Sequence, residues 1–191
     1  QLSKPRLRTL RQKVGVVFQQ FNLVQNVSVF QNVLYGALGQ QRLGLLSTLS
    51  WTASHELRER AMQSLDRVGL AHKAQASCRE LSGGQQQRVA IARTLMQDAQ
   101  IIIADEPIAS LDPKAGREIM DLLLEVVSER GLTVLCTLHQ LELAQQYGDR
   151  IVGMKAGTVV LDSPRSTVSL NSMRELYQGE TRVDQTSLSP N

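Results

Sequence analysis

Residues 81–88 of the chain read Leu-Ser-Gly-Gly-Gln-Gln-Gln-Arg, and residues 101–107 read Ile-Ile-Ile-Ala-Asp-Glu-Pro. The first stretch predicts a glycine-rich turn that opens a helix, and the second predicts a buried strand that ends in two carboxylates. The N-terminus of a helix attracts anions, and glycine lets a phosphate approach the backbone closely. A bare Ser-Gly-Gly would indicate only a helix cap, but the residues behind it and the acidic strand favour a phosphate site.

The two carboxylates suit two different tasks, because adjacent residues at a strand end point in different directions. One carboxylate can hold Mg²⁺, directly or through its waters. The other can orient or deprotonate a water molecule that attacks a phosphate. We assign Asp105 to the metal and Glu106 to the water, and Pro107 ends the strand because proline cannot extend a sheet ladder.

Two further strands are expected to end in polar residues. The strand over residues 14–18 ends at Gln19, and the strand over residues 133–137 leads to His139. Ligands of parallel sheets gather at the carboxyl ends of the strands. We expect the Gln19 amide to contact the metal and the water, and His139 to donate a hydrogen bond to a γ-phosphate oxygen. The alternative for each is a loop residue with no chemical task.

Apolar spacing predicts helices over residues 27–38, 54–68, 85–97 and 113–130. Ser54 and Asp112 are the expected N-caps, and Pro113 occupies the first helical position. Gly69 and Gly131 are the expected stops.

Strands are expected over residues 14–18, 101–104, 133–137, 151–154 and 158–161. The strand over 101–104 shows no polar alternation, which predicts cover on both faces. The last two strands flank Lys155-Ala156-Gly157, a hairpin signal. The basic stretch 4–13 is expected to be a solvated lead-in to the first strand; a nucleic-acid arm is the alternative, disfavoured because no aromatic residues interleave the charges. Alternation of strands and helices predicts an α/β fold.

Composition bounds the class of protein. The 191 residues can form one domain with a proper core, 42% of them are hydrophobic, and the net charge of +3 demands no nucleic acid or anionic membrane as partner. No apolar run approaches the ~20 residues that span a bilayer, and no signal peptide is recognised. We therefore expect a soluble protein.

This ordered set of motifs resembles the ATP-binding subunits of ABC transporters over residues 10–165. The correspondences, in chain order, are Gln19 with the Q-loop glutamine, residues 81–88 with the family signature, residues 101–106 with the Walker B strand, residues 110–112 with the D-loop, and His139 with the switch histidine. Residues 34–39, 104–113 and 137–140 further resemble the ATPases of phosphonate importers. Importers of phosphate or polar amino acids are alternatives.

The resemblance implies an α/β fold with a P-loop NTPase-like ABC ATPase core whose N-terminal strands and phosphate loop are absent. Residues 1–24 and 81–165 would form this partial RecA-like core, and residues 25–80 would be inserted as a helical subdomain. Residues 166–191 are expected to form a C-terminal extension that is partly disordered.

The resemblance also implies an ATPase that uses ATP and Mg²⁺ and couples hydrolysis to solute uptake. Two such subunits form a head-to-tail dimer, with each ATP between them. Asp105 and Gln19 would serve the metal, and Glu106 would activate water together with His139. The remaining contacts, to the partner's ATP and across the interface, would come from Ser82, Gly83, Gly84, Gln85 and Asp112.

Further partners are implied by the same resemblance. Membrane permease subunits would dock near Gln19 and the helical subdomain, and a periplasmic solute-binding protein would act indirectly. The expected location is the cytoplasmic face of the inner membrane, as a peripheral subunit, with no nucleic acid as partner.

One part of the family's pattern does not occur in this sequence. The phosphate-binding loop Gly-x-x-x-x-Gly-Lys-Ser/Thr, which in the family precedes the Q-loop, is found nowhere in the 191 residues. The chain begins with Gln1, and we expect a fragment of a full ATPase that is inactive in isolation; a genuine partial subunit is the alternative. The rival functions are a non-transport ABC-type ATPase associated with carbon–phosphorus lyase and a degenerate, non-catalytic interface module.

Overall fold

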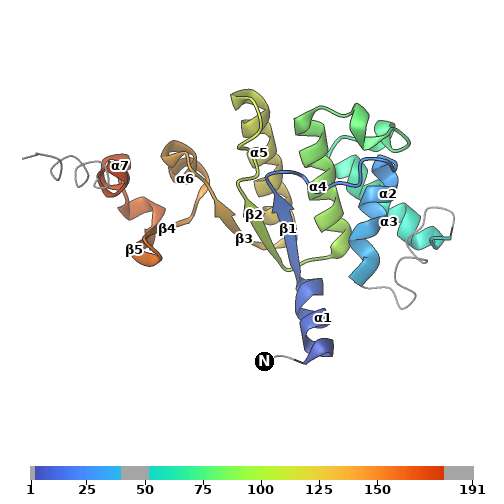
Figure 1. Ribbon diagram of the computed structural model, residues 1–191, viewed down its shortest axis with the longest axis horizontal. Helices are drawn as coiled ribbons and strands as arrows, with labels where there is room; N and C mark the ends of the chain where they lie inside the picture. The colour runs from blue at the N-terminus through green and yellow to red at the C-terminus, as the bar shows by residue number, and fades with distance from the viewer. Residues whose placement is uncertain (1–2, 40–51, 179–191) are drawn as a thin grey trace, which may run out of the picture. The chain divides into compact units, whose positions relative to one another are not determined.

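The computed structural model describes residues 3–39 and 52–178 (Figure 1). The chain divides into two compact units, Gln1–Thr137 and Leu138–Asn191. The expected loop over residues 39–52 and the expected disorder of the tail lie largely outside the described residues. Within the described ranges, every helix is too short or too polar to cross a membrane.

The first unit is built on a parallel sheet in the order β1-β2-β3, with β1 at Val14–Phe18, β2 at Ile101–Asp105 and β3 at Thr133–Thr137. In the register of the strands, Phe18 pairs with Asp105, and Asp105 pairs with Thr137. All three strands therefore end at the same level of the sheet. The expected strand bounds are confirmed for β1 and β3, and β2 runs one residue further than expected.

Helices of the first unit pack around a central helix, α4 (Gly83–Gln97), which contacts β1 (Figure 1). The elements that pack against α4 are α2 (Val29–Leu34), the 3₁₀ helix η1 (Tyr35–Gly39), α3 (His55–Arg67) and α5 (Pro113–Arg130). Arg67 of α3 also donates to the carboxylates of Glu125 and Glu129 on α5, at 3.1 and 2.8 Å. The described part of the unit also contains two short 3₁₀ helices, η3 (Ala71–Lys73) and η4 (Cys78–Glu80).

The expected caps are confirmed. Ser54 accepts a hydrogen bond from the Leu57 N–H at the start of α3, and Asp112 does the same for two N–H groups of α5. Gly131 ends α5 in the left-handed conformation, at φ +61°. These short polar residues and glycines satisfy the backbone groups that a helix leaves unpaired at its ends.

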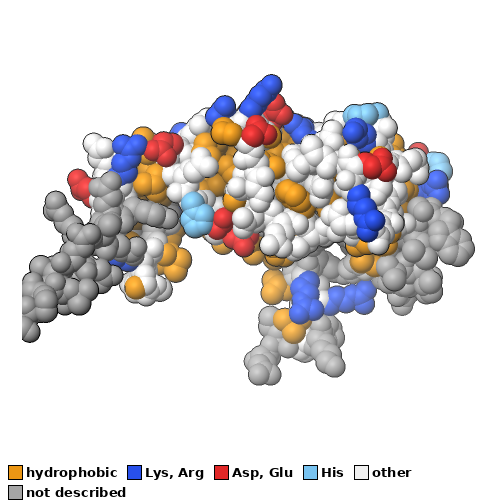
Figure 2. All heavy atoms as spheres, turned by 45° about the horizontal axis from the view of Figure 1, so that its top comes forward, with side chains coloured by type: hydrophobic (Ala, Val, Ile, Leu, Met, Phe, Trp, Pro, Cys, Tyr) orange, Lys and Arg blue, Asp and Glu red, His pale blue; other side chains and the backbone are white. Residues whose placement is uncertain are grey.

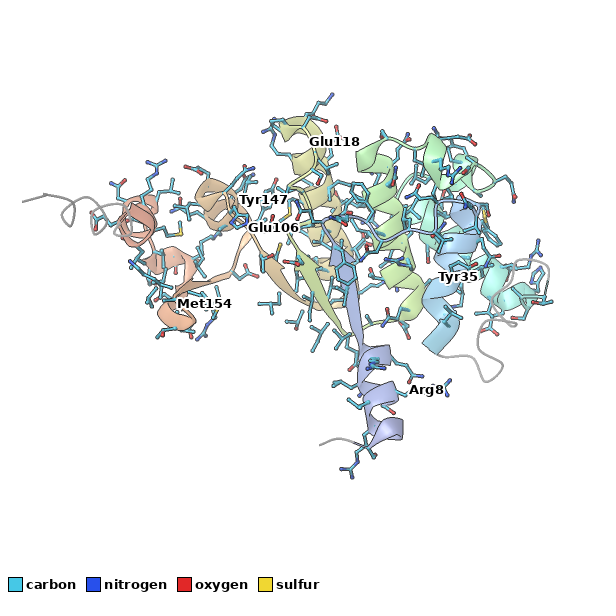
Figure 3. All side chains as sticks on the ribbon, viewed as in Figure 1. Arg8, Tyr35, Glu106, Glu118, Tyr147 and Met154 are labelled. Carbon is cyan, nitrogen blue, oxygen red and sulfur yellow. The ribbon has the colours of Figure 1, made fainter. Side chains whose placement is uncertain are left out.

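The basic stretch at the start of the chain is a mostly exposed lead-in to β1, as expected, and it takes the form of a helix, α1 (Lys4–Lys13). A proline in its first turn and a run of good helix formers favour the helix. Figure 2 shows blue Lys and Arg side chains on this element. Arg8 donates to the carbonyl of Gly39 at 3.3 Å, which ties α1 to η1 (Figure 3).

The expectation of a strand covered on both faces is wrong for the described residues. Burial alternates along β2, where Ile102 and Ala104 are buried but Ile101 is 41% exposed. On β3, Leu135 of the same open face is 60% exposed. An uninterrupted apolar run does not reveal which of its side chains find a partner, because that depends on elements elsewhere in the fold.

The second unit contains α6 (Leu141–Tyr147), β4 (Arg150–Lys155), β5 (Thr158–Pro164), the 3₁₀ helix η5 (Arg165–Thr167) and α7 (Leu170–Gln178). Its core is a cluster of Ile151, Val168 and Met173. The antiparallel pairing of β4 and β5 confirms the expected hairpin. Ala156 and Gly157 turn the chain with φ of +47° and +78°, as a tight two-residue hairpin loop requires.

Gly36 brings the backbone of η1 close to the backbone of α4. A Cβ atom there would lie 2.2 Å from the carbonyl oxygen of Arg93. We expect Gly36→Ala to lower the free energy of unfolding by about 3 kcal/mol, since the backbone of α4 must move away. Urea denaturation measures the loss.

Gly39→Ala, in the same 3₁₀ helix, is the matched control. Among the described residues its Cβ would meet only the flexible Gln12 side chain, at 3.3 Å, so we expect a change of less than about 1 kcal/mol. Equal effects of the two substitutions would contradict the proposed close approach.

Candidate functional site

The glycine-rich turn forms the N-terminus of α4, as predicted. Ser82 is the N-cap: its hydroxyl accepts from the Gln85 N–H at 3.4 Å, and the Gln85 side chain accepts from the Ser82 N–H at 3.2 Å. This reciprocal pair is a capping box. The N–H groups of Gly83 and Gly84 occupy the first helical positions, where no intrahelical partner exists. They are the donors that an anion at this turn would use.

A second turn lies against the first. A Cβ atom on Gly83 would lie 3.1 Å from the side chain of Leu111, and one on Gly84 would lie 3.6 Å from Ala115. Leu111 immediately precedes Asp112, the N-cap of α5. The structure thus places the predicted anion-binding turn beside the start of α5, with glycine leaving room for the contact.

Asp112 is exposed and caps α5. Its Oδ1 accepts hydrogen bonds from the backbone N–H groups of Ala115 at 3.0 Å and Lys114 at 3.1 Å. These bonds favour the charged carboxylate and so hold the pKa of Asp112 below its ordinary value, and the bond from Ala115 has the largest effect.

The acidic pair stands at the carboxyl end of β2. Asp105 is the last residue of the strand and is exposed, and Glu106 follows with φ of +46°, in the left-handed region that a residue with a Cβ rarely adopts. Figure 3 labels Glu106. The Glu106 carbonyl accepts from Ala109 N–H at 3.2 Å, which starts the turn toward α5.

Thr137, the last residue of β3, contacts both members of the pair. Its hydroxyl lies 2.7 Å from Asp105 Oδ1 and 2.9 Å from the Glu106 backbone nitrogen. Sequence reasoning did not assign this residue to the site. One signal could have identified it. The strand over 133–137 is expected to run parallel to the acidic strand, and the ends of neighbouring parallel strands meet at one edge of the sheet, so its last residue should lie near the acidic pair.

Gln87 is a second residue that the sequence reasoning missed. It is buried in α4, and its side-chain amide donates to the Pro107 carbonyl at 2.7 Å. This bond joins the helix that begins at the glycine-rich turn to the residue that follows the acidic pair. Gln87 is one of three consecutive glutamines in the stretch 81–88, and its polar side chain gave no indication that it would be buried.

Gln19 lies in the exposed turn that follows β1, at the same edge of the sheet as the acidic pair. The residues after it are held by α4, because Arg93 donates to the carbonyls of Asn22 at 2.7 Å and Phe21 at 3.3 Å. Burial lowers the pKa of the Arg93 guanidinium. His139 is an exposed residue of the second unit, ahead of α6, and its predicted role stays a prediction.

The comparison with protein families gives one match. A family model described as ABC transporter matches residues 1–109. Among curated relatives, a phosphonates import ATP-binding protein from Thiobacillus denitrificans is 48% identical over 189 residues, which cover 96% of this chain and 70% of the relative. A protein of the same description from Frankia casuarinae is 54% identical over 160 residues, covering 82% and 61%.

A third relative carries a different description. A phosphate-import ATP-binding protein from Mycolicibacterium smegmatis is 49% identical over 178 residues, covering 93% of this chain and 67% of the relative. The chain thus spans 61 to 70% of the length of these three proteins.

Solved structures show the same fold. The cbiO1 protein from Clostridium perfringens, part of an ABC transporter complex, matches with a TM-score of 0.76 and 32% identity, over 95% of this chain and 68% of that one. A dimeric ATP-binding cassette bound to ADP and phosphate matches with a TM-score of 0.67 and 38% identity, over 86% and 68%. The described fold is therefore that of an ATP-binding cassette.

The cap at α5 leads to a pH-dependent prediction. Asp112→Ala removes the acceptor of two N–H groups, so we expect the melting temperature at pH 7 to fall by about 3 °C. Folding lowers the pKa of Asp112, so the charged carboxylate stabilises the folded state at pH values above the ordinary carboxyl pKa. This stabilisation is lost as the pH falls through the pKa of Asp112 in the folded state. The difference should therefore shrink below about pH 4. Thermal melts from pH 7 to pH 2 measure it.

The control is Asp112→Asn, which keeps a capping oxygen that does not titrate. Its difference from Asp112→Ala should be independent of pH. A constant difference between the wild type and Asp112→Ala over the whole range would contradict the role of the charge.

Proposed function

Because this chain belongs to the ABC transporter family, we propose that it acts as the ATP-binding and ATP-hydrolysing subunit of an importer for phosphonates or a related oxyanion. The observation that carries the proposal is the edge of the sheet where β1, β2 and β3 end at one level, with Asp105 and Glu106 at the end of the middle strand. The relatives that match nearly the whole chain support the choice of solute class.

The chemistry of the acidic pair suits a hydrolytic site with Mg²⁺. The described residues hold no cluster of three or more His, Cys, Asp or Glu side chains that would make a dedicated metal cage. Mg²⁺ needs no such cage, since one carboxylate, waters and the nucleotide's phosphate oxygens suffice. Asp105 fits that single carboxylate, and the Gln19 amide is the proposed second contact. The ion would neutralise charge on the phosphates.

Glu106 is the proposed general base. Its backbone lies one residue beyond Asp105, the last residue of β2, and turns out of the extended conformation with φ of +46°. Glu106 would orient and deprotonate the attacking water, and His139 would donate to the γ-phosphate. This division keeps metal binding and proton transfer on separate side chains.

The glycine-rich turn is proposed to act in a second site. Solved cassettes of this fold include dimeric ones. In a head-to-tail dimer, Ser82, Gly83, Gly84 and Gln85 would contact the ATP held mainly by the partner subunit, and Asp112 would lie at the interface. The contact of Leu111 with Gly83 would then connect the interface to the turn.

The chain is proposed to bind membrane permease subunits near Gln19 and the helices of residues 25–80, as a peripheral subunit at the membrane. In this proposal, a solute-binding protein delivers the solute to the permease. The relative described as a phosphate-import protein makes inorganic phosphate the second candidate solute. Radiolabelled uptake by cells expressing the transporter, with phosphonate and phosphate as competitors, distinguishes the two.

The ATP affinity of the 191-residue chain can be predicted from the motifs it contains. The phosphate-binding loop of the family is not among the 191 residues, and its backbone and lysine supply most phosphate contacts. We expect titration calorimetry of the 191-residue chain to give a dissociation constant far weaker than micromolar. A micromolar constant would show that the described site holds ATP without that loop.

A substitution at Glu106 tests its proposed role as the general base. In a chain extended at its N-terminus by the phosphate-loop segment of a relative, Glu106→Gln should lower kcat by about 100-fold or more and leave ATP affinity nearly unchanged. Phosphate release and nucleotide binding measure the two effects. Glu175→Gln, an exposed position of α7, is the control and should keep wild-type turnover. Undiminished turnover in Glu106→Gln would remove Glu106 from its proposed role.

A further inference from the structure

The hydroxyl of Thr137 contacts both members of the acidic pair. It lies 2.7 Å from Asp105 Oδ1 and 2.9 Å from the Glu106 nitrogen. The register pairs Thr137 with Asp105 across β2 and β3, so both side chains leave the same face of the sheet. A hydroxyl at this position therefore reaches the carboxylate without any movement of the strands.

The direction of both hydrogen bonds is fixed by chemistry. The Glu106 backbone N–H can only donate, so the Thr137 oxygen accepts it. Oδ1 of the Asp105 carboxylate accepts, so the hydroxyl proton of Thr137 goes to Oδ1. The Thr137 hydroxyl can therefore accept from the Glu106 N–H and donate to Asp105 Oδ1 at the same time.

The bond to Glu106 acts on a strained backbone. Glu106 has φ of +46°, a conformation in which Cβ crowds the following carbonyl oxygen. Rotation about the bond from nitrogen to Cα defines φ, and the Thr137 hydroxyl holds the peptide unit on the nitrogen side of that bond. Loss of the hydroxyl would release the constraint that keeps this peptide, and the Glu106 side chain beyond it, in place.

The bond to Asp105 acts on the carboxylate. It engages one lone pair of Oδ1 and restrains the rotation of the carboxylate plane. Threonine suits the task because its branched Cβ restricts χ1 and favours a strand. Hydrogen bonds to a ligating carboxylate are the usual means by which proteins orient such ligands.

We propose that Thr137 is a positioning residue of the hydrolytic site, which holds the Asp105 carboxylate in the orientation for Mg²⁺ and the Glu106 backbone in its left-handed conformation. The inference rests on the proposed function for the part that concerns the metal. The part that concerns Glu106 follows from the contacts of this chain alone.

The first experiment uses the ¹⁵N-labelled 191-residue chain and measures amide hydrogen exchange at Glu106 by NMR. Thr137→Val keeps the shape and strand preference but removes the hydroxyl, so exchange at Glu106 should speed up by about three- to tenfold, the range for one ordinary hydrogen bond. Thr137→Ser should restore the wild-type rate. Thr133→Val makes the same change on the same face of β3 and should leave the rate unchanged.

The second experiment uses the extended chain and measures ATP hydrolysis against Mg²⁺ concentration. In Thr137→Val, the Mg²⁺ concentration for half-maximal rate should rise about threefold or more and kcat should fall, while KM for ATP at saturating Mg²⁺ stays constant. Thr137→Ser should restore both values, and Thr133→Val should not alter them. A purely structural role of Thr137 would not shift the Mg²⁺ dependence.

The outcomes separate the two proposals. Unchanged exchange at Glu106 in Thr137→Val, or an unchanged Mg²⁺ dependence in an active enzyme, overturns the positioning role alone. An extended wild-type chain that hydrolyses no ATP overturns the proposed function and, with it, the metal-orienting part. Thermal melts of all variants, with Thr137→Ala as a second deletion of the hydroxyl, show whether a loss of folding explains a change.

Discussion

Parallel pairing of β1, β2 and β3 in register is the constraint on which the site depends. Phe18, Asp105 and Thr137 lie side by side in the sheet, so the residues after each strand leave from one edge. Thr137 lies 32 residues from Asp105 in the sequence, so the residues around Asp105 do not indicate this contact. Their contact exists because backbone hydrogen bonds fix the register, and a one-residue slip would turn the Thr137 hydroxyl to the other face of the sheet.

The central helix α4 connects the glycine-rich turn to the rest of the site. At its N-terminus, Ser82 and Gln85 satisfy each other and leave the glycine N–H groups for an anion. Further along, Gln87 donates to the Pro107 carbonyl, and Arg93 donates to the backbone that follows Gln19. A movement of α4 would therefore act on the segments that follow both β1 and β2.

Much of this arrangement could be predicted where the determinants are local. The caps at Ser54 and Asp112, the stop at Gly131 and the hairpin at Ala156 depend on residues within one turn of the chain, and the structure confirms each of them. The open face of β2 and the helix over residues 4–13 could not be predicted in the same way. Cover of a strand and the final state of a basic segment depend on packing partners that a sequence pattern does not contain.

The left-handed Glu106 shows why the chemistry of the site is only partly legible in the sequence. Two adjacent carboxylates indicate a metal ligand and a base, but they do not indicate that the backbone between strand and turn is strained. Such a conformation persists where neighbouring groups hold it, and here the neighbours are the Thr137 hydroxyl on one side and the Ala109 N–H on the other. The strand end thus supplies the acid residues, while a different strand and the following turn determine how they point. In this fold, the geometry of the acidic pair is a property of the sheet edge as a whole.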